Sequence, residues 1–281
     1  MILCIVGPSG IGKTSLSIDL AKKYNAIVLN ADATQIYKEL DIGSAKITEE
    51  EKQGIPHFLF DIKSPDEDYS VADYQKDARK ILDEYKNRNI VVVGGTGLYI
   101  RALFYDYEFE DKTKKDYSSY SNEELYNMAK SIDSNMDIHI NNRVRLENFI
   151  DANGNIKKDS KPIYDVIYIG LTTDRDNLYK ILDKRVDKMF DNGLLDEVTN
   201  LYHKYPSSNI LKRAIGYKEV ISYLNNEISL DDAKELIKKN TRHYAKRQYT
   251  WFNNQLDVTW FNQSNNILEE VTHFISGLNS K

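Results

Sequence analysis

The sequence predicts an α/β protein in which a parallel β-sheet is flanked by helices and carries a small helical insertion. Three observations predict this fold class. Short apolar runs alternate with segments of helical spacing, a glycine-rich turn follows the first run, and the composition changes between residues 105 and 161. Continuous apolar runs are typical of strands that are buried on both faces, as in parallel sheets. A chain of 281 residues is long enough for one medium domain with an insertion.

The first part of the chain alternates strand and helix. Strands are predicted at residues 1–6, 26–29 and 90–93. A helix is predicted at residues 13–24, where Leu16, Leu20 and Tyr24 have helical spacing, and another at residues 71–88. Thr48 and Glu51 have the spacing of a capping box, which predicts a short charged helix after Thr48.

The rest of the chain begins with the insertion and then returns to the sheet. Residues 105–161 are rich in tyrosine, lysine and asparagine, and Ser121 and Glu124 form a second capping-box pattern. We therefore predict a first core segment at residues 1–104, a helical insertion at 105–161 and a second core segment at 162–281. The second core segment is predicted to hold strands at 166–171 and 256–261 and helices at 174–191, 194–205, 217–224, 230–252 and the C-terminus.

The composition excludes several classes of protein. No apolar run approaches the ~18–20 residues that a membrane span requires. A single cysteine, Cys4, cannot form an internal disulfide, so we expect the reducing cytoplasm. The net charge of −5 argues against a protein that coats nucleic acid over its whole surface, but it leaves a local basic face possible.

The turn after the first strand carries phosphate-binding chemistry. Residues 7–14 fit the pattern G-x-x-x-x-G-K-[ST] and read Gly7, Pro8, Ser9, Gly10, Ile11, Gly12, Lys13, Thr14. Backbone N–H groups in such a turn and at the following helix terminus bind anions. Lys13 supplies a cation for the outer phosphate, and Thr14 supplies a hydroxyl for Mg²⁺. The pattern between a strand and a helix predicts a P-loop NTPase-like sheet that binds a diphosphate or a triphosphate such as ATP.

Two further strand ends refine this expectation. The third strand ends in Val93 and Gly94 with no carboxylate, which argues against ATPases and GTPases and leaves group-transfer enzymes. The second strand is followed by Asp32, and carboxyl ends of parallel strands share one crevice. Asp32 is therefore expected to face the phosphate loop, although taken alone it is more often a turn or capping residue.

An ordered set of motifs resembles the tRNA dimethylallyltransferase (tRNA isopentenyltransferase) family. The motifs are G-P-S-G-I-G-K-T from Gly7, D-A-T-Q-I-Y from Asp32, D-I-G-S-A-K from Asp41, P-H-F-L-F-D from Pro56, Y-S-V-A-D-Y from Tyr69, G-G-T-G-L-Y-I from Gly94, A-I-G-Y-K-E from Ala214 and T-R-H-Y-A-K-R-Q from Thr241. They occur in family order along nearly the whole chain. Apart from the phosphate loop, no single motif is specific, but the ordered set is.

The resemblance implies a reaction and its parts. Members of this family move a dimethylallyl group from its diphosphate to the exocyclic amine of the adenosine 3′ of the anticodon. By resemblance, the loop holds the diphosphate with Lys13, Thr14 and Mg²⁺, Asp32 is the general base, and Ser9 lies near the reacting centre, where the family usually has threonine. The implied partners are dimethylallyl diphosphate and the tRNA anticodon stem-loop, with no membrane, for a cytoplasmic monomer. The stretches that match tRNA-contacting ones are Asp32, Ala33, Thr34, Gln35, Thr96, Arg213, Ala214, Ile215, Gly216, Tyr217 and Lys218.

The chain departs from the family pattern in two further places. Ala33 stands where the family commonly has serine. In the insertion, the family's Asn- and Arg-rich helix is represented clearly only by Asn141 and Arg145. We still expect Arg145 to contact tRNA, but the departures put the anticodon contacts of the insertion in doubt and leave the transfer site intact.

A basic helix near the C-terminus suggests a surface for RNA. Residues 238–247 hold five basic residues and no acid, and Lys239, Arg242, Lys246 and Tyr249 share one predicted helical face. We expect Arg242, Lys246 and Arg247 to bind tRNA through its phosphates. A solvated surface is the alternative, and Arg242 or Arg247 could reach the diphosphate instead.

Three other functions remain open on the residues alone. A small-molecule or nucleotide kinase also uses a phosphate loop, but it would leave the basic helix without a role. A relative that prenylates free adenylate shares the chemistry with a smaller acceptor. A nucleic-acid-binding module with a structural nucleotide is the third alternative.

Overall fold

The computed structural model describes residues 1–107, 115–154 and 161–278. The chain divides into two compact units. The first consists of residues 1–104 and 164–281, and the second of residues 105–163. In the described part of the chain, no helix is long and apolar enough to cross a membrane.

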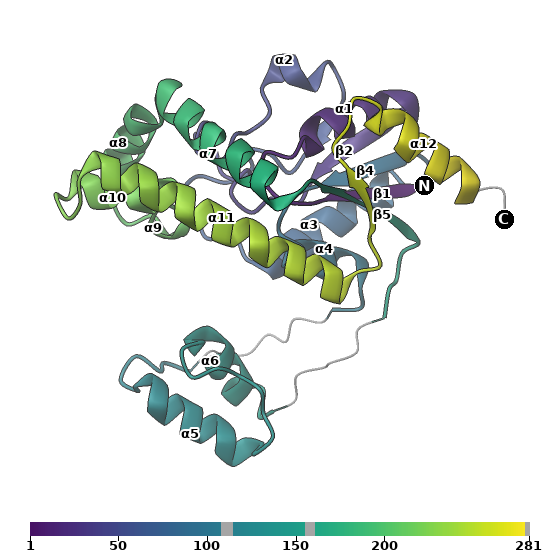
Figure 1. Cartoon of the computed structure of the whole chain (residues 1–281). Helices are drawn as coiled ribbons and strands as arrows, with labels where there is room; N and C mark the ends of the chain where they lie inside the picture. The colour runs from purple at the N-terminus through teal and green to yellow at the C-terminus, as the bar shows by residue number, and fades with distance from the viewer. Residues whose placement is uncertain (108–114, 155–160, 279–281) are drawn as a thin grey trace. The chain divides into compact units, whose positions relative to one another are not determined.

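The first unit is built on an all-parallel sheet with the strand order β3-β2-β4-β1-β5-β6 (Figure 1). The strands are β1 (Ile2–Val6), β2 (Ala26–Asn30), β3 (His57–Phe58), β4 (Asn89–Val93), β5 (Val166–Thr172) and β6 (Thr259–Asn262). Val93 pairs with both Ile5 and Asn30, so the carboxyl ends of β1, β2 and β4 lie at one edge of the sheet. The phosphate loop and Asp32 therefore start from neighbouring points, as the sequence predicts.

Helices cover both faces of the sheet (Figure 1). On one face lie α1 (Lys13–Lys23) and α12 (Ile267–Leu278), which share a core with the odd residues of β1 through side chains such as Leu16, Leu20 and Ile275. On the other lie α3 (Val71–Glu84) and α4 (Gly97–Phe104), which pack against each other. Burial of apolar side chains on both faces stabilises the sheet.

A group of helices lies beside the carboxyl edge. They are α7 (Arg175–Asp191), α8 (Leu194–Lys204), α9 (Asn209–Arg213), α10 (Tyr217–Leu224) and α11 (Leu230–Gln255). Helix α2 (Glu49–Lys52) lies in the connection between β2 and β3. Helix α11 packs along α7 and against α10, and α10 also contacts α8 (Figure 1). The capping box of Thr48 and Glu51 at the start of α2 is confirmed, because each side chain accepts a hydrogen bond from the backbone N–H of the other.

The second unit has its own small core. Helices α5 (Asn122–Ile132) and α6 (Arg143–Asp151) pack against each other through Leu125, Leu146 and Phe149. The capping box of Ser121 and Glu124 is confirmed. Residues 108–114 and 155–160 of the predicted insertion lie outside the described residues.

Several boundaries differ from the prediction. Helix α3 ends at Glu84, before the predicted residue 88, because residues 85–88 form a turn closed by a hydrogen bond from Arg88 N to Tyr85 O. Helix α11 continues to Gln255 and β6 begins at Thr259, both later than predicted. Helices α4 and α9 and strand β3 were not predicted. Helix α4 starts directly after a glycine-rich stretch that reads as a turn, and β3 has two residues only.

Candidate functional site

The phosphate loop connects β1 to α1 in the conformation that its glycines allow. Gly7, Gly10 and Gly12 have φ angles of 136°, 79° and 96°, which residues with a side chain rarely adopt. Gly12 is the N-cap of α1 and offers no side chain to its first N–H groups. These groups therefore remain available to an anion, and the helix dipole favours one there.

Lys13 folds back over this loop. Its Nζ donates hydrogen bonds to the carbonyl oxygens of Gly7 (2.9 Å) and Pro8 (2.8 Å). Burial lowers the pKa of Lys13 from 10.5 to about 8, an effect that Asp32 partly offsets and Arg185 reinforces. A diphosphate beside Lys13 would favour its charged form, so ligand binding and protonation of Lys13 are linked.

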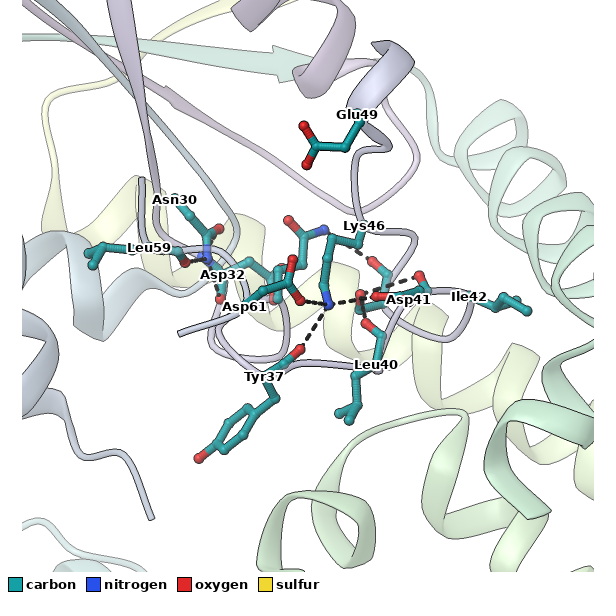
Figure 2. Close-up of polar contacts among 12 residues, drawn as sticks. Asn30, Asp32, Tyr37, Leu40, Asp41, Ile42, Lys46, Glu49, Leu59 and Asp61 are labelled. Atoms are coloured by element: carbon teal, nitrogen blue, oxygen red, sulfur yellow. Dashed lines mark hydrogen bonds and ion pairs between the residues drawn. The ribbon is translucent and has the colours of Figure 1, made fainter. Parts of the chain in front are cut away.

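Asp32 is held by a buried asparagine (Figure 2). The Oδ1 of Asn30 accepts from the backbone N–H of Asp32 (2.9 Å), and its Nδ2 donates to the carbonyl oxygens of Asp32 (3.0 Å) and Leu59 (2.9 Å). Thr96 Oγ1 accepts from the N–H of Ala33. One carboxylate oxygen of Asp32 accepts from Thr34 N, so the turn is fixed while the other oxygen has no hydrogen bond within the described structure. The sequence analysis did not identify Asn30. The signal that could have identified it is a polar residue at the end of an otherwise apolar strand.

Two cavities meet at Asp32. The smaller has a volume of about 130 Å³ and is lined by the phosphate loop, by Gln35 and Ala45, and by a more apolar end. The larger has a volume of about 460 Å³ and lies between the loop after β2 and helices α7, α10 and α11. Three residues line both cavities: Ser9, Asp32 and Arg185. A group bound in one cavity can therefore meet a group bound in the other beside the Asp32 carboxylate.

Arg185 on α7 is the main site residue that sequence reasoning missed. Its Nη2 donates to the carbonyl oxygen of Ser44 (3.3 Å), and its stem lies against Gly10 of the phosphate loop. Burial lowers its pKa, and the negative charge of Asp32 opposes that shift. A guanidinium at this point can contact a phosphate in the smaller cavity.

Positive charge dominates the larger cavity. Four cations line it, namely Arg185, Arg213, Lys218 and Arg247, against the single carboxylate of Asp32. Tyr244 also lines it, and burial together with Asp32 raises its pKa to about 12, so the phenol stays protonated at neutral pH. The cavity suits an anionic ligand.

The side of α11 that faces this cavity differs from the predicted RNA face. The lining residues from α11 are Ile237, Asn240, Thr241, Tyr244 and Arg247. Lys239 and Lys246 are exposed and line neither cavity. Tyr249 donates to Thr172 Oγ1 on β5 (2.5 Å), so it packs against the sheet. None of the four residues of the predicted face therefore lines either cavity.

Arg242 lies away from both cavities. Its guanidinium forms a bidentate ion pair with Asp183 on α7 (2.6 and 2.8 Å) and lies over the ring of Tyr179. Arg242 therefore joins α11 to α7, and it lines neither the phosphate cavity nor the larger one. Neither of the two ligand roles considered for it is supported by this position.

The other predicted site residues fall into four groups. Gln35, which was expected to contact tRNA, lines the smaller cavity. Those lining the larger cavity are Ser9, Asp32, Ala33, Thr34, Thr96, Arg213, Ala214, Ile215, Gly216, Lys218 and Arg247. Tyr217 was expected to contact tRNA, but its side chain is fully buried and donates to Glu197, so it supports the cavity wall from behind. Arg145 is exposed on α6 of the second unit.

The chemistry of the phosphate loop fits Mg²⁺. Thr14 is exposed, lines the smaller cavity and presents a hydroxyl oxygen, which is a hard ligand. Among the described residues, no cluster of three or more His, Cys, Asp or Glu side chains could hold a metal. The fit is therefore to an ion that takes one protein oxygen and completes its shell with phosphate oxygens and water, which is how Mg²⁺ commonly binds.

The parallel sheet, the phosphate loop and the two joined cavities define a P-loop group-transfer enzyme. Residues 35–255 match the model of the family described as IPP transferase, and the chain belongs to this family. It is 41% identical to the tRNA dimethylallyltransferase of Anoxybacillus flavithermus over 299 residues, covering 98% of this chain and 96% of that one. It is 43% identical to the enzyme of the same name from Fusobacterium nucleatum, covering 92% and 91%.

Solved structures agree with the sequence comparisons. The tRNA delta(2)-isopentenylpyrophosphate transferase of Staphylococcus epidermidis superimposes with a TM-score of 0.77 at 37% identity, covering 98% of this chain and 99% of that one. A eukaryotic dimethylallyltransferase acting on tRNA gives a TM-score of 0.81 at 25% identity, covering 94% and 74%. The predicted family and the predicted P-loop NTPase-like fold are both confirmed.

Proposed function

We propose that this protein transfers a dimethylallyl group from dimethylallyl diphosphate to the exocyclic amine of the adenosine 3′ of the anticodon in tRNA. The observation that carries the proposal is the junction of a phosphate-binding cavity with a larger cationic cavity at Asp32. The names of the relatives and of the solved structures support the same reaction.

The smaller cavity fits the donor. Backbone N–H groups of the loop, Lys13 and Arg185 would hold the diphosphate, and the apolar end of the cavity, which includes Ile47 and Phe60, suits a five-carbon chain. Bound Mg²⁺, held by Thr14 and the diphosphate, would neutralise charge on the leaving group. The same fixed cations would stabilise the charge that develops on the diphosphate as the allylic C–O bond breaks.

Asp32 fits the role of general base. As the bond from the adenine amine to the allylic carbon forms, the amine must lose a proton, and the carboxylate can accept it. The hydrogen bonds between Asn30 and the backbone of Asp32, and from Ala33 N to Thr96, hold the Asp32 turn in place before substrates arrive. The adenine must leave its stack to reach this carboxylate, because a stacked base cannot enter a cavity.

The larger cavity fits the acceptor. Its volume of about 460 Å³ lies within the range of about 300–1,000 Å³ that is usual for small-molecule sites. Arg213, Lys218 and Arg247 would neutralise phosphates on either side of the extruded nucleotide. Arg145 and the second unit remain proposed tRNA contacts on the strength of the sequence alone.

A product analysis tests the proposal. The protein is incubated with dimethylallyl diphosphate and Mg²⁺ together with unmodified tRNA, its isolated anticodon stem-loop, or AMP, and in a parallel reaction with ATP and candidate small alcohols. The products are identified by mass spectrometry. We expect the dimethylallyl mass on the adenosine 3′ of the anticodon in both RNAs. Modification of AMP alone would indicate a free-adenylate enzyme, and phosphate transfer from ATP to a small alcohol without prenyl transfer would indicate a kinase.

A further inference from the structure

The carboxylate of Glu197 on α8 holds the loop of residues 41–44, which lies between the two cavities. Glu197 Oε2 accepts from the backbone N–H groups of Asp41 (3.1 Å) and Ile42 (2.7 Å), and Oε1 accepts from Gly43 N (3.0 Å). The hydroxyl of Tyr217 donates to the same Oε1 (2.8 Å). Three successive N–H groups aimed at one anion form a nest, and hydrogen bonds to a charged acceptor are the strong kind.

The loop fixed in this way belongs to both cavities. Gly43 and Ser44 line the larger cavity, and Ala45 lines the smaller one. The carbonyl oxygen of Ser44 accepts from Gln35 Nε2 (3.1 Å) and from Arg185 Nη2 (3.3 Å). The position of this backbone therefore determines the shape of the acceptor wall and the place of two side chains beside the reacting centre.

Further contacts leave the loop little freedom. The buried ring of Tyr217 lies so close to Gly43 that a Cβ there would come within 2.5 Å of it. At the other end of the loop, the nearly buried Nζ of Lys46 contacts Tyr37 O (2.8 Å), Asp41 (2.7 Å) and Asp61 (Figure 2). Glu197 supplies the contacts to the part of the loop that reaches the larger cavity.

We propose that Glu197 is a positioning residue for the acceptor, which it serves by fixing residues 41–44 as a wall of the larger cavity. The inference rests on the proposed transfer reaction. It predicts that loss of the Glu197 carboxylate weakens productive tRNA binding more than donor binding. The phosphate loop, which holds most of the donor, is fixed by separate contacts, and of the described residues only Gln35, Ala45 and Arg185 connect the smaller cavity to the loop that Glu197 holds.

The same two parts of the chain provide a matched control. Glu39 ties the connection after β2 to the end of α8 through Lys204 Nζ (2.8 Å) and Tyr205 Oη (2.9 Å). Its side chain is 45% exposed, and none of these three residues lines either cavity. Glu39→Gln therefore weakens the hydrogen bonds between the connection after β2 and the end of α8 without changing a residue that lines a cavity.

The test compares Glu197→Gln with Glu39→Gln in the full-length protein. The amide keeps the shape of the carboxylate but replaces one acceptor oxygen with an NH₂ group that cannot accept. For Glu197→Gln we expect KM for tRNA to rise about tenfold or more, as for the loss of hydrogen bonds to a charged group. Donor affinity, measured by titration with dimethylallyl diphosphate, should fall clearly less than this, by about threefold at most, because Lys13 and the phosphate loop keep their contacts. Glu39→Gln should keep the parent's kinetics.

Tyr217→Phe removes one hydrogen bond to Glu197. It should raise KM for tRNA by less than Glu197→Gln does, and it provides the test if Glu197→Gln does not fold.

Three results would overturn the inference. If Glu197→Gln keeps the parent's KM for tRNA, the carboxylate is a structural tie only. If the constants for both substrates worsen together in proportion to a fall in Tm, in both glutamine variants, the effect is general destabilisation. If the parent itself transfers nothing to tRNA, the proposed function fails and the inference with it, which distinguishes this result from the first.

Discussion

The half-buried ammonium of Lys13 makes donor binding depend on pH. Burial lowers its pKa to about 8 in the free protein, so the side chain is mostly charged near pH 7 and only about one-tenth charged near pH 9. A bound diphosphate stabilises the charged form, so binding above this pKa takes up a proton. The affinity for dimethylallyl diphosphate should therefore be nearly constant below pH 8 and fall about tenfold per pH unit above it.

The effect on folding has the opposite sign. The unfolded chain, with a lysine pKa of 10.5, holds this proton more tightly than the folded protein does. Between about pH 8 and 10.5, the Lys13 contribution therefore makes the free energy of unfolding rise with pH. A fall in donor affinity in this window cannot come from unfolding caused by Lys13.

Calorimetric titration of dimethylallyl diphosphate from about pH 7 to about pH 9.5 measures the effect. Repeating it in buffers of different ionisation enthalpy counts the protons taken up. Lys13→Arg is the control, because a guanidinium stays charged throughout and should remove the inflection. A parent affinity that stays constant across this range, or an inflection that persists in Lys13→Arg, would show that protonation of Lys13 does not control donor binding.

Four further variants test other parts of the site. Asp32→Asn should lower turnover by ~10² or more with little change in Tm, and a loss below tenfold would make Asp32 a turn residue. Arg185→Gln should lower turnover by about 10²–10³, because a fixed cation is removed from the leaving group. Unchanged single-turnover rates would exclude that role. Arg247→Gln should reduce the slope of log tRNA affinity against log salt by about 0.7. Arg242→Gln should leave this slope unchanged and lower Tm by a few degrees through loss of the Asp183 ion pair, and a reduced slope would return Arg242 to the RNA surface.

Much of the fold follows from local pattern. Buried parallel strands are continuous apolar runs, so β1, β2, β4 and β5 could be placed from the sequence, as could the capping boxes. Helix α4 could not, because its first residue is Gly97, whose lack of a side chain admits the Trp251 ring from α11. That requirement comes from a contact between segments distant in the chain, which no local pattern records.

The site divides in the same way. The phosphate loop and Asp32 were predictable because adjacent strand ends and one short motif define them. Arg185 was not, because it is one of several charges on α7 and only its position over Gly10 distinguishes it. The face of α11 that meets the cavity was not predictable for a related reason. Spacing shows which residues share a face, but the packing of α11 on α7 decides which face meets the cavity.

The most direct test of the central claim is a structure of the protein with an anticodon stem-loop RNA and an unreactive analogue of dimethylallyl diphosphate. We expect the diphosphate on residues 9–14 and an extruded adenine in the larger cavity, with the exocyclic amine of the adenine within about 2.6–3.2 Å of the Asp32 carboxylate. An adenine bound elsewhere, or a donor whose allylic carbon does not lie between the phosphate loop and that amine, would contradict it.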